Sequence, residues 1–185
     1  MGKEPDLLAL ENRRNIYRTL LLNPGIHHRE LQRRIGMTTG TLEYHLHYLE
    51  KKELVMKKRD GRNVRYFVKE KMGRKEKDLM MLLRRKDARD LVMHLLLSGP
   101  CTAKDACAHI GLDGAALSSA LSQLLKNGIV SNDPNGRLCI ENEDAVTELL
   151  ITYKESFLDE TVDRFAEIWV DLGKTQERKK PVLEE

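Results

Sequence analysis

Residues 31–55 read LQRRIGMTTGTLEYHLHYLEKKELV, and this stretch decides the fold. Leu42, Leu46 and Leu49 recur at helical spacing, which is typical of a helix face that packs on a core. Gly36 follows a shorter segment of the same kind, and a glycine in that place commonly closes a helix in the left-handed conformation. The stretch therefore predicts two short helices joined by a tight turn.

The flanking sequence extends this pair of helices into a larger unit. A helix is expected over 7–22, because its apolar residues have helical spacing and it ends at Asn23-Pro24-Gly25. Two β-rich segments, 54–58 and 63–69, surround Asp60-Gly61, a dipeptide that favours a hairpin turn. Three helices followed by a β-hairpin are the elements of a winged helix-turn-helix domain.

A second copy of this pattern follows at a constant offset of 75 residues. Residues 20–25 (LLLNPG) resemble residues 95–100 (LLLSGP), and Ile35-Gly36 corresponds to Ile110-Gly111. Such self-similarity predicts a tandem of two related domains. The second copy is expected to have helices over 74–97, 102–110 and 113–127, and a hairpin that turns at Asn135-Gly136.

The last part of the chain carries apolar residues at helical spacing from 144 to 173. This pattern predicts one long amphipathic helix, with more apolar surface than a small domain readily covers. We therefore expect a homodimer in which this helix pairs with its copy. The predicted dimerisation residues are Val146, Leu150, Tyr153, Phe157, Phe165, Ile168, Trp169 and Leu172.

Charge divides the chain into two unlike halves. Residues 1–86 hold 22 Lys and Arg against 11 Asp and Glu, a net charge of +11. Residues 87–185 hold 10 against 18, a net charge of −8, so the whole chain has only +3. A basic half of this kind favours a polyanionic partner, and by charge alone both nucleic acid and an anionic membrane surface fit.

The remaining composition favours a cytoplasmic protein with no membrane partner. The longest apolar runs, such as 79–83, are too short to span a bilayer, and the N-terminus lacks the apolar region of a signal peptide. Cys101, Cys107 and Cys139 are odd in number and irregular in spacing, so no disulfide framework is expected.

The first copy contains the pattern Leu31-x-x-x-Ile35-Gly36-x-Thr38-x-x-Thr41-Leu42-x-Tyr44-His45-Leu46-x-x-Leu49-Glu50-x-x-x-Leu54-Val55. This pattern resembles winged-helix transcription regulators of the ArsR/MarR-like superfamily. More narrowly, the whole chain resembles archaeal regulators with two such domains. The match of the first domain covers about residues 8–69. The second copy keeps the apolar positions of the pattern and loses its basic surface. The resemblance implies a DNA-binding fold and identifies neither an operator nor an effector.

Two polar surfaces of the first domain are expected to contact DNA. Small polar residues that begin the helix over 38–53 suit close approach to base edges in the major groove. Cations on the hairpin suit phosphates or the minor groove. The predicted contact residues are Arg33, Arg34, Thr38, Thr39, Thr41, Glu43, Tyr44, His47, Lys57, Lys58, Arg59, Arg62, Asn63 and Arg65. Plain surface roles stay open for Tyr44 and His47, and His45 is expected to pack between helices.

These observations predict a mainly α (α+β) fold, with two tandem winged helix-turn-helix domains, small β-hairpin wings and a long C-terminal helix. The expected divisions are a DNA-binding domain over 1–72, a degenerate second domain over 73–142, a dimerisation helix over 143–174 and a flexible tail over 175–185. The predicted function is a sequence-specific DNA-binding transcription regulator that acts as a homodimer, with an unidentified small-molecule effector left open. The alternative is a protein-binding winged-helix scaffold, for which the charge of +11 would be unnecessary.

No catalytic or metal-binding motif stands out. The sequence lacks a P-loop, a glycine-rich phosphate loop, an HExxH motif and a nucleophile elbow, so neither an enzyme nor a cofactor is expected. His27-His28 and His45-x-His47 lack the cysteine or acidic neighbours of a zinc site. Cys101-x5-Cys107-x-His109 suits a soft metal or redox sensing, but a structural role is expected and no metal is predicted.

Overall fold

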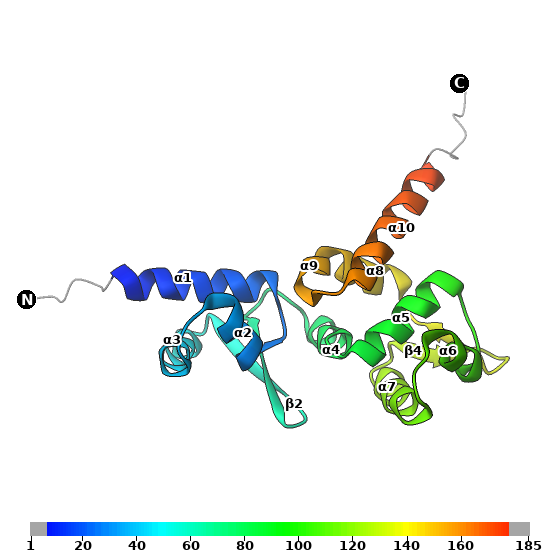
Figure 1. Cartoon of the computed structure of the whole chain (residues 1–185), viewed down its shortest axis with the longest axis horizontal. Coiled ribbons are helices and arrows are strands. Elements are labelled where there is room, and N and C mark those ends of the chain that lie inside the picture. The colour runs from blue at the N-terminus through cyan, green and yellow to red at the C-terminus, as the bar shows by residue number, and fades with distance from the viewer. Residues whose placement is uncertain (1–6, 178–185) are drawn as a thin grey trace, which may run out of the picture. The chain divides into compact units, whose positions relative to one another are not determined.

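The computed structural model describes the backbone of residues 7–177 and the side chains of residues 10–171. The chain divides into two compact units, Met1–Arg89 and Asp90–Glu185 (Figure 1). Helices dominate the described residues, and two small antiparallel sheets accompany them, which agrees with a helix-turn-helix fold of the α+β class. None of the described helices combines the length and apolar character that a membrane span requires.

The first unit begins with three helices and a three-stranded sheet. The helices are α1 (Leu7–Leu22), α2 (His28–Ile35) and α3 (Thr39–Lys51), and the strands are β1 (Ile26–His27), β2 (Val55–Asp60) and β3 (Asn63–Val68). The strand order is β1-β3-β2, with both pairings antiparallel. β2 and β3 form the predicted hairpin, in which Asp60 pairs with Asn63 across the turn (Figure 1).

An apolar core joins these helices to the sheet. Ile16 and Leu20 of α1, Leu31 of α2, Leu42 of α3 and Ile26 of β1 are completely buried. Full burial of such a side chain stabilises the fold by about 1.5–3 kcal/mol. The core therefore fixes the orientation of α3 and leaves its opposite face at the surface.

Local caps determine where α2 and α3 begin and end. His27 begins α2, because its Nδ1 accepts a hydrogen bond from the Glu30 N–H at 3.1 Å. Burial lowers the pKa of His27, which favours the neutral ring that can accept this bond. Gly36 ends α2 with φ of 72°, a conformation that costs little only for glycine. Thr38 then caps α3 by accepting from the Thr41 N–H, so the tight turn predicted at Gly36 is confirmed.

The single helix expected over 74–97 is instead two helices, α4 (Arg74–Leu83) and α5 (Lys86–Ser98). The break lies at Arg84 and Arg85, whose side chains both reach back to earlier residues of the first unit. Arg84 donates two hydrogen bonds to the Pro24 carbonyl at 3.0 and 3.2 Å, and Arg85 pairs with Asp60 at 2.6 Å. These contacts join residues far apart in sequence, so helical periodicity gives no sign of them. They hold α4 to the first unit, which extends to Arg89.

The second unit contains two helices joined by a tight turn and followed by a shorter hairpin. Its elements are α6 (Ala103–Ile110), α7 (Gly114–Lys126), β4 (Val130–Asn132) and β5 (Leu138–Ile140). Both helices start and end 75 residues after α2 and α3. Gly111 closes α6 with φ of 71°, and Asp113 caps α7 at the place that Thr38 occupies before α3.

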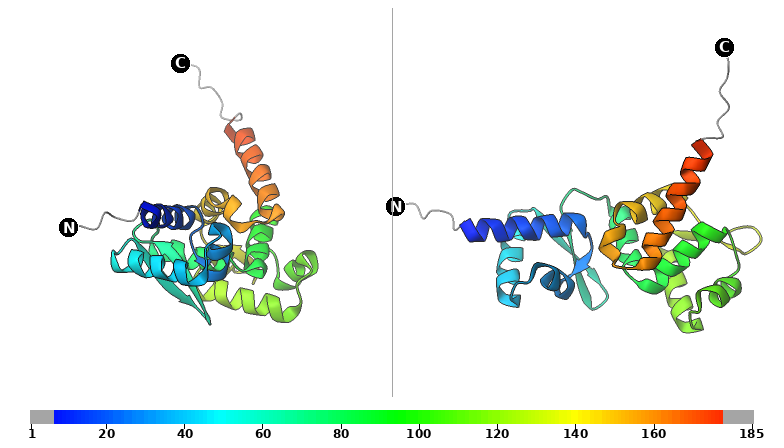
Figure 2. Two further views of the ribbon diagram at one scale, coloured as in Figure 1. Left: turned by 60° about the vertical axis from the view of Figure 1, so that its left-hand side comes forward. Right: turned by 45° about the horizontal axis from the view of Figure 1, so that its top comes forward.

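The prediction of one long helix over 144–173 is wrong. The segment forms three helices, α8 (Glu143–Thr152), α9 (Lys154–Phe157) and α10 (Glu160–Glu177), of which α10 projects from the rest of its unit (Figure 2). Leu158 interrupts the helical backbone with φ of 52°, and the Asp159 carboxylate accepts the Thr161 N–H where α10 begins. Apolar spacing continues across this break, because periodicity reports which face is buried rather than whether the backbone is continuous.

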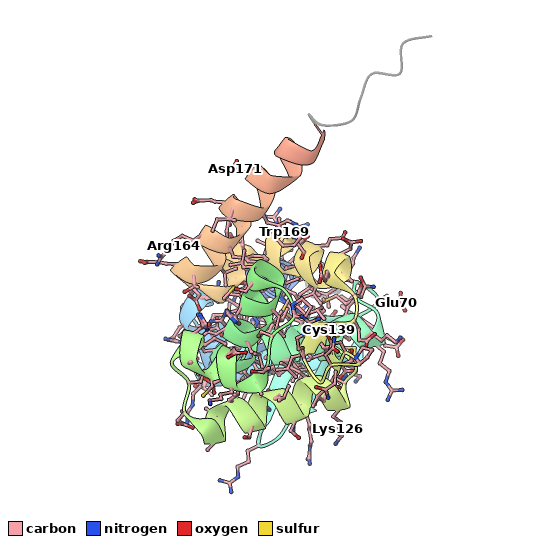
Figure 3. The ribbon with its side chains drawn as sticks, turned by 90° about the vertical axis from the view of Figure 1, so that its right-hand side faces the viewer. Glu70, Lys126, Cys139, Arg164, Trp169 and Asp171 are labelled. Atoms are coloured by element: carbon pink, nitrogen blue, oxygen red, sulfur yellow. The ribbon has the colours of Figure 1, made fainter. Side chains whose placement is uncertain are left out.

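Much of the apolar face expected in a dimer is covered within the single chain. Val146, Leu150 and Phe165 are buried, and Tyr153, Phe157 and Trp169 are partly buried. The rings of Phe165 and Trp169 stack with centroids 5.6 Å apart, and Figure 3 shows Trp169 along α10 with Arg164 and Asp171. Ile168 is 46% exposed, while the side chain of Leu172 lies outside the described residues. α10 continues to Glu177, past the expected start of the tail at 175, and residues 178–185 are outside the description.

Candidate nucleic-acid interface

α3 packs one face into the core and exposes the other. Leu42, His45, Leu46 and Leu49 are buried. The exposed face carries Thr39, Thr41, Glu43, Tyr44 and His47, all of which the sequence predicts as DNA contacts. The structure therefore brings the five predicted side chains of this helix onto one surface.

The threonines at the start of α3 are held by hydrogen bonds. Thr38 Oγ1 accepts the Thr41 N–H at 3.3 Å and lies 2.8 Å from Thr41 Oγ1. Thr39 Oγ1 accepts from Gln32 Nε2 of α2 at 3.1 Å. Thr38 therefore acts as the cap, while Thr39 and Thr41 present exposed hydroxyls beside the first turn, where helix N–H groups favour an anion.

Tyr44 gives this surface a large aromatic side chain, with 63% of it exposed. Its ring meets the ring of His45 edge-on, with centroids 5.2 Å apart. His45 is buried, and its Nε2 lies 3.4 Å from Asn12 Nδ2 of α1, so its predicted packing between helices is confirmed. Glu43 is exposed and approaches His28 Nε2 at 4.0 Å.

Three of the five cations predicted on the wing are bound to carboxylates, and two of these three are lysines. Lys57 Nζ lies 2.9 Å from Glu50 Oε2 of α3, and this hydrogen bond raises the pKa of Lys57. Lys58 forms an ion pair with Asp78 of α4. Because each lysine is already paired with a carboxylate, its attraction for a DNA phosphate is reduced.

Arg59 and Arg62 are exposed cations of the wing that are not paired with any carboxylate the structure describes. Neither forms an ion pair with any side chain in the described part of the chain. Arg62 lies in the hairpin turn, and Asn63 beside it is also exposed. The two arginines therefore present unshared positive charge at the end of the hairpin.

Arg65 does not belong to this surface, contrary to the expectation from sequence. It is only 7% exposed, its Nε lies 2.9 Å from Asp60 Oδ2, and its Nη1 donates to the Gly25 carbonyl at 3.1 Å. Burial disfavours the ionised Asp60, but hydrogen bonds from Arg85 and Arg65 outweigh this effect and lower the pKa of Asp60. Counting cations on a hairpin cannot reveal which of them point inward, and Arg65 is a structural residue.

α2 contributes a different set of cations from the one predicted. Arg34 is half-buried and donates from Nε and Nη2 to Glu30 Oε1 at 3.2 and 2.8 Å. Arg33 and Arg29 are exposed, and neither has an ion-pair partner among the side chains described. The sequence prediction included Arg33 and left out Arg29, which lies in the first turn of α2.

The corresponding surface of the second unit carries little positive charge. α7 has no Lys or Arg before Lys126. The one arginine of the hairpin, Arg137, pairs with Asp133 at 2.8 Å.

In this part of the chain, the free thiols of Cys101, Cys107 and Cys139 are partly buried. Across the described residues, no group of three or more His, Cys, Asp or Glu is arranged to hold a metal ion.

The sequence prediction also missed a cluster of cations on α1. Arg13, Arg14 and Arg18 line a groove together with Tyr48 and Lys52 from the end of α3. A signal was present, because residues 13, 14, 17 and 18 share a helix face, but no motif connects them with the distant end of α3.

Comparisons with known proteins agree with this geometry. Residues 10–80 match the family model of an N-terminal HTH domain. The chain is also 29% identical over 133 residues to an uncharacterized HTH-type transcriptional regulator of Methanocaldococcus jannaschii. This match covers 72% of the chain and 33% of the relative, so the chain spans about a third of that protein's length. Together with the exposed face of α3, the match over residues 10–80 supports a helix-turn-helix domain in the first unit.

Proposed function

We propose that the chain is a sequence-specific DNA-binding transcription regulator that reads double-stranded DNA through its first winged helix. The observation that carries this proposal is the combination of two surfaces in one unit. The start of α3 exposes uncharged Thr39, Thr41 and Tyr44, while the wing exposes the unshared charges of Arg59 and Arg62. Uncharged hydrogen-bonding groups suit base edges, and arginines suit phosphates or a narrow minor groove.

The second unit has a different role in this proposal. We infer from the 75-residue offset of its helices, caps and closing glycine that it is a tandem relative of the first winged helix, related to ArsR/MarR-like domains. α7 exposes Ala115, Ser118 and Ser119 at the positions of Gly40, Glu43 and Tyr44 in α3, and the one arginine of its hairpin, Arg137, is already paired with Asp133. Such a surface gives phosphate little attraction and suits close packing against protein. The second unit therefore supports assembly or sensing instead of reading DNA.

The proposed regulator acts as a homodimer. Two copies would present two α3 helices to half-sites one DNA turn apart, which doubles the contact and favours a palindromic operator. Leu158, Ile168 and Val170 support self-association, because they leave 76%, 46% and 41% of their respective surfaces exposed at the end of the chain. This apolar surface is smaller than the continuous stripe predicted from the sequence.

A salt titration of DNA binding tests the proposal. The full chain is first used to select its preferred duplex from random sequences, and fluorescence anisotropy then compares that duplex with random DNA. Arg62→Ala is expected to weaken binding to both duplexes alike and to reduce the salt slope by about one for each phosphate that is no longer neutralised. Tyr44→Ala is expected to weaken binding by about 1–3 kcal/mol on the selected duplex and by little on random DNA.

Two matched variants control this experiment. Lys75→Ala removes an exposed cation from α4 and should change neither affinity nor slope. Arg65→Ala should lower the thermal stability, because it breaks the buried pair with Asp60. Equal losses and slopes for Arg62→Ala and Tyr44→Ala would overturn the assigned roles, and absence of DNA binding would favour a protein-binding scaffold.

A further inference from the structure

A groove of about 610 Å³ lies in the first unit, between α1 and the C-terminal end of α3. Its floor is apolar and is formed by Leu10, Tyr17, Tyr48, Leu49 and Leu54. Leu10 and Leu54 leave 39% and 46% of their surfaces exposed there. The volume is within the range of roughly 300–1,000 Å³ that is typical of small-molecule sites.

Four cations surround this apolar floor: Arg13, Arg14, Arg18 and Lys52. None of them forms an ion pair with an acidic side chain in the described part of the chain. Four unshared charges around one apolar groove repel each other, so the site favours an anion.

Arg13 is held in a position that suits an anionic ligand. Its guanidinium carbon lies 3.5 Å from the centroid of the Tyr48 ring, and Lys52 Nζ lies 5.9 Å from the same centroid. The Nε of Arg13 is buried and has no hydrogen-bond acceptor among the described residues. A buried donor without an acceptor is costly, and a ligand oxygen that displaced the atoms covering this nitrogen would relieve the cost.

The groove is separate from the surface proposed to read DNA. α3 rises about 1.5 Å per residue, so Lys52 lies about 20 Å along the axis from Thr39. An apolar floor is also unsuited to a phosphate backbone, which needs charge and hydrogen bonds alone. The cations around the groove are therefore suited to an anionic ligand other than duplex DNA.

We propose that this groove binds an amphipathic organic anion, with an apolar chain on the leucine and tyrosine floor and a carboxylate or phosphate head beside Arg13. Tyr48, Leu49 and Lys52 belong to the same helix as Thr39 and Tyr44 or to its cap. A ligand in the groove therefore acts on the position of α3 and, through it, on DNA binding. This effect on DNA binding rests on the proposed DNA-binding function. Binding of the anion itself does not rest on it.

Calorimetry on the full chain without DNA tests the site. The probes are octanoate, its neutral counterpart 1-octanol, and acetate as the head group alone. Octanoate is expected to bind saturably, one per chain, and at least about tenfold more tightly than either control, since both the charge and the apolar chain contribute. Arg13→Gln should weaken octanoate binding about tenfold or more, and Lys52→Gln should weaken it less.

Lys75→Gln on α4 is the matched control and should leave octanoate binding unchanged, while circular dichroism verifies that every variant is folded. Equal binding of octanoate to the wild type and folded Arg13→Gln would overturn the proposal, as would 1-octanol binding as tightly as octanoate. A change of sedimentation mass in Arg13→Gln would instead identify the groove as an interface between copies and would also overturn it. Because DNA is absent, failure here is distinct from failure of the DNA-binding proposal.

Discussion

Asp60 shows how a single carboxylate determines which wing cations are available to a partner. It accepts from Arg65 within the hairpin and from Arg85 beyond α4, and only 9% of it is exposed. By drawing Arg65 inward, it leaves Arg59 and Arg62 as the unshared charges of the wing. The identity of the residue at position 60 therefore matters for the surface as well as for stability.

Replacement of Asp60 by Asn should destabilise the first unit. Arg65 would then be a buried charge without its carboxylate, and breaking such a pair costs about 3 kcal/mol or more. Urea unfolding at neutral pH measures this loss. Glu148→Gln, an exposed change on α8, is the control and should stay within about 0.5 kcal/mol of the wild type.

The same pair gives the stability of the first unit a defined pH dependence. The folded pKa of Asp60 is lowered, so its contribution is full above the ordinary value of 3.8 and is lost as pH falls through the lower folded pKa. Unfolding of the wild type should therefore show an acid-sensitive component in this window. The Asp60→Asn protein should lack that component, and equal acid sensitivity of the two proteins would contradict the assignment.

At the scale of elements, the turn between α2 and α3 depends on backbone conformation. Gly36→Ala should destabilise the domain by about 1–2 kcal/mol, because φ of 72° is unfavourable for alanine even where no neighbour obstructs its Cβ. Gly40→Ala, inside α3 and equally unobstructed, should instead stabilise it by about 0.5 kcal/mol. Thermal unfolding of the two variants compares an identical chemical change in two backbone conformations, and a loss of stability in both would argue against this explanation.

The helices and hairpins of both units follow from the sequence, because their apolar spacing and turn residues are local signals. The helix breaks at Arg84 and at Leu158 do not follow from it. The first depends on hydrogen bonds to Pro24 and Asp60, far away in the chain, and the second preserves the apolar period across a left-handed residue. The exposed face of α3 was predictable for the same reason as its core, whereas the inward direction of Arg65 depends on partners that only the folded chain brings together.

For the whole molecule, the proposed homodimer can be tested directly, because light scattering measures the mass of the particle in solution. Light scattering at micromolar concentration should give twice the chain mass of 21.3 kDa. Joint replacement of Ile168 and Val170 by Asp should give a monomer with weaker operator binding, since it places charges at both exposed apolar side chains described on α10. Glu167→Gln on the same helix should leave the dimer intact. A monomeric wild type would contradict the homodimer.

The Asp60–Arg65–Arg85 cluster also restricts how related sequences can diverge. Asp60 and Asn63 face each other across the shortest part of the hairpin, while Arg85 reaches the same carboxylate from the end of α4. Because these three side chains depend on one another, homologues that lack one of them should lack the others, so we expect positions 60, 65 and 85 to covary.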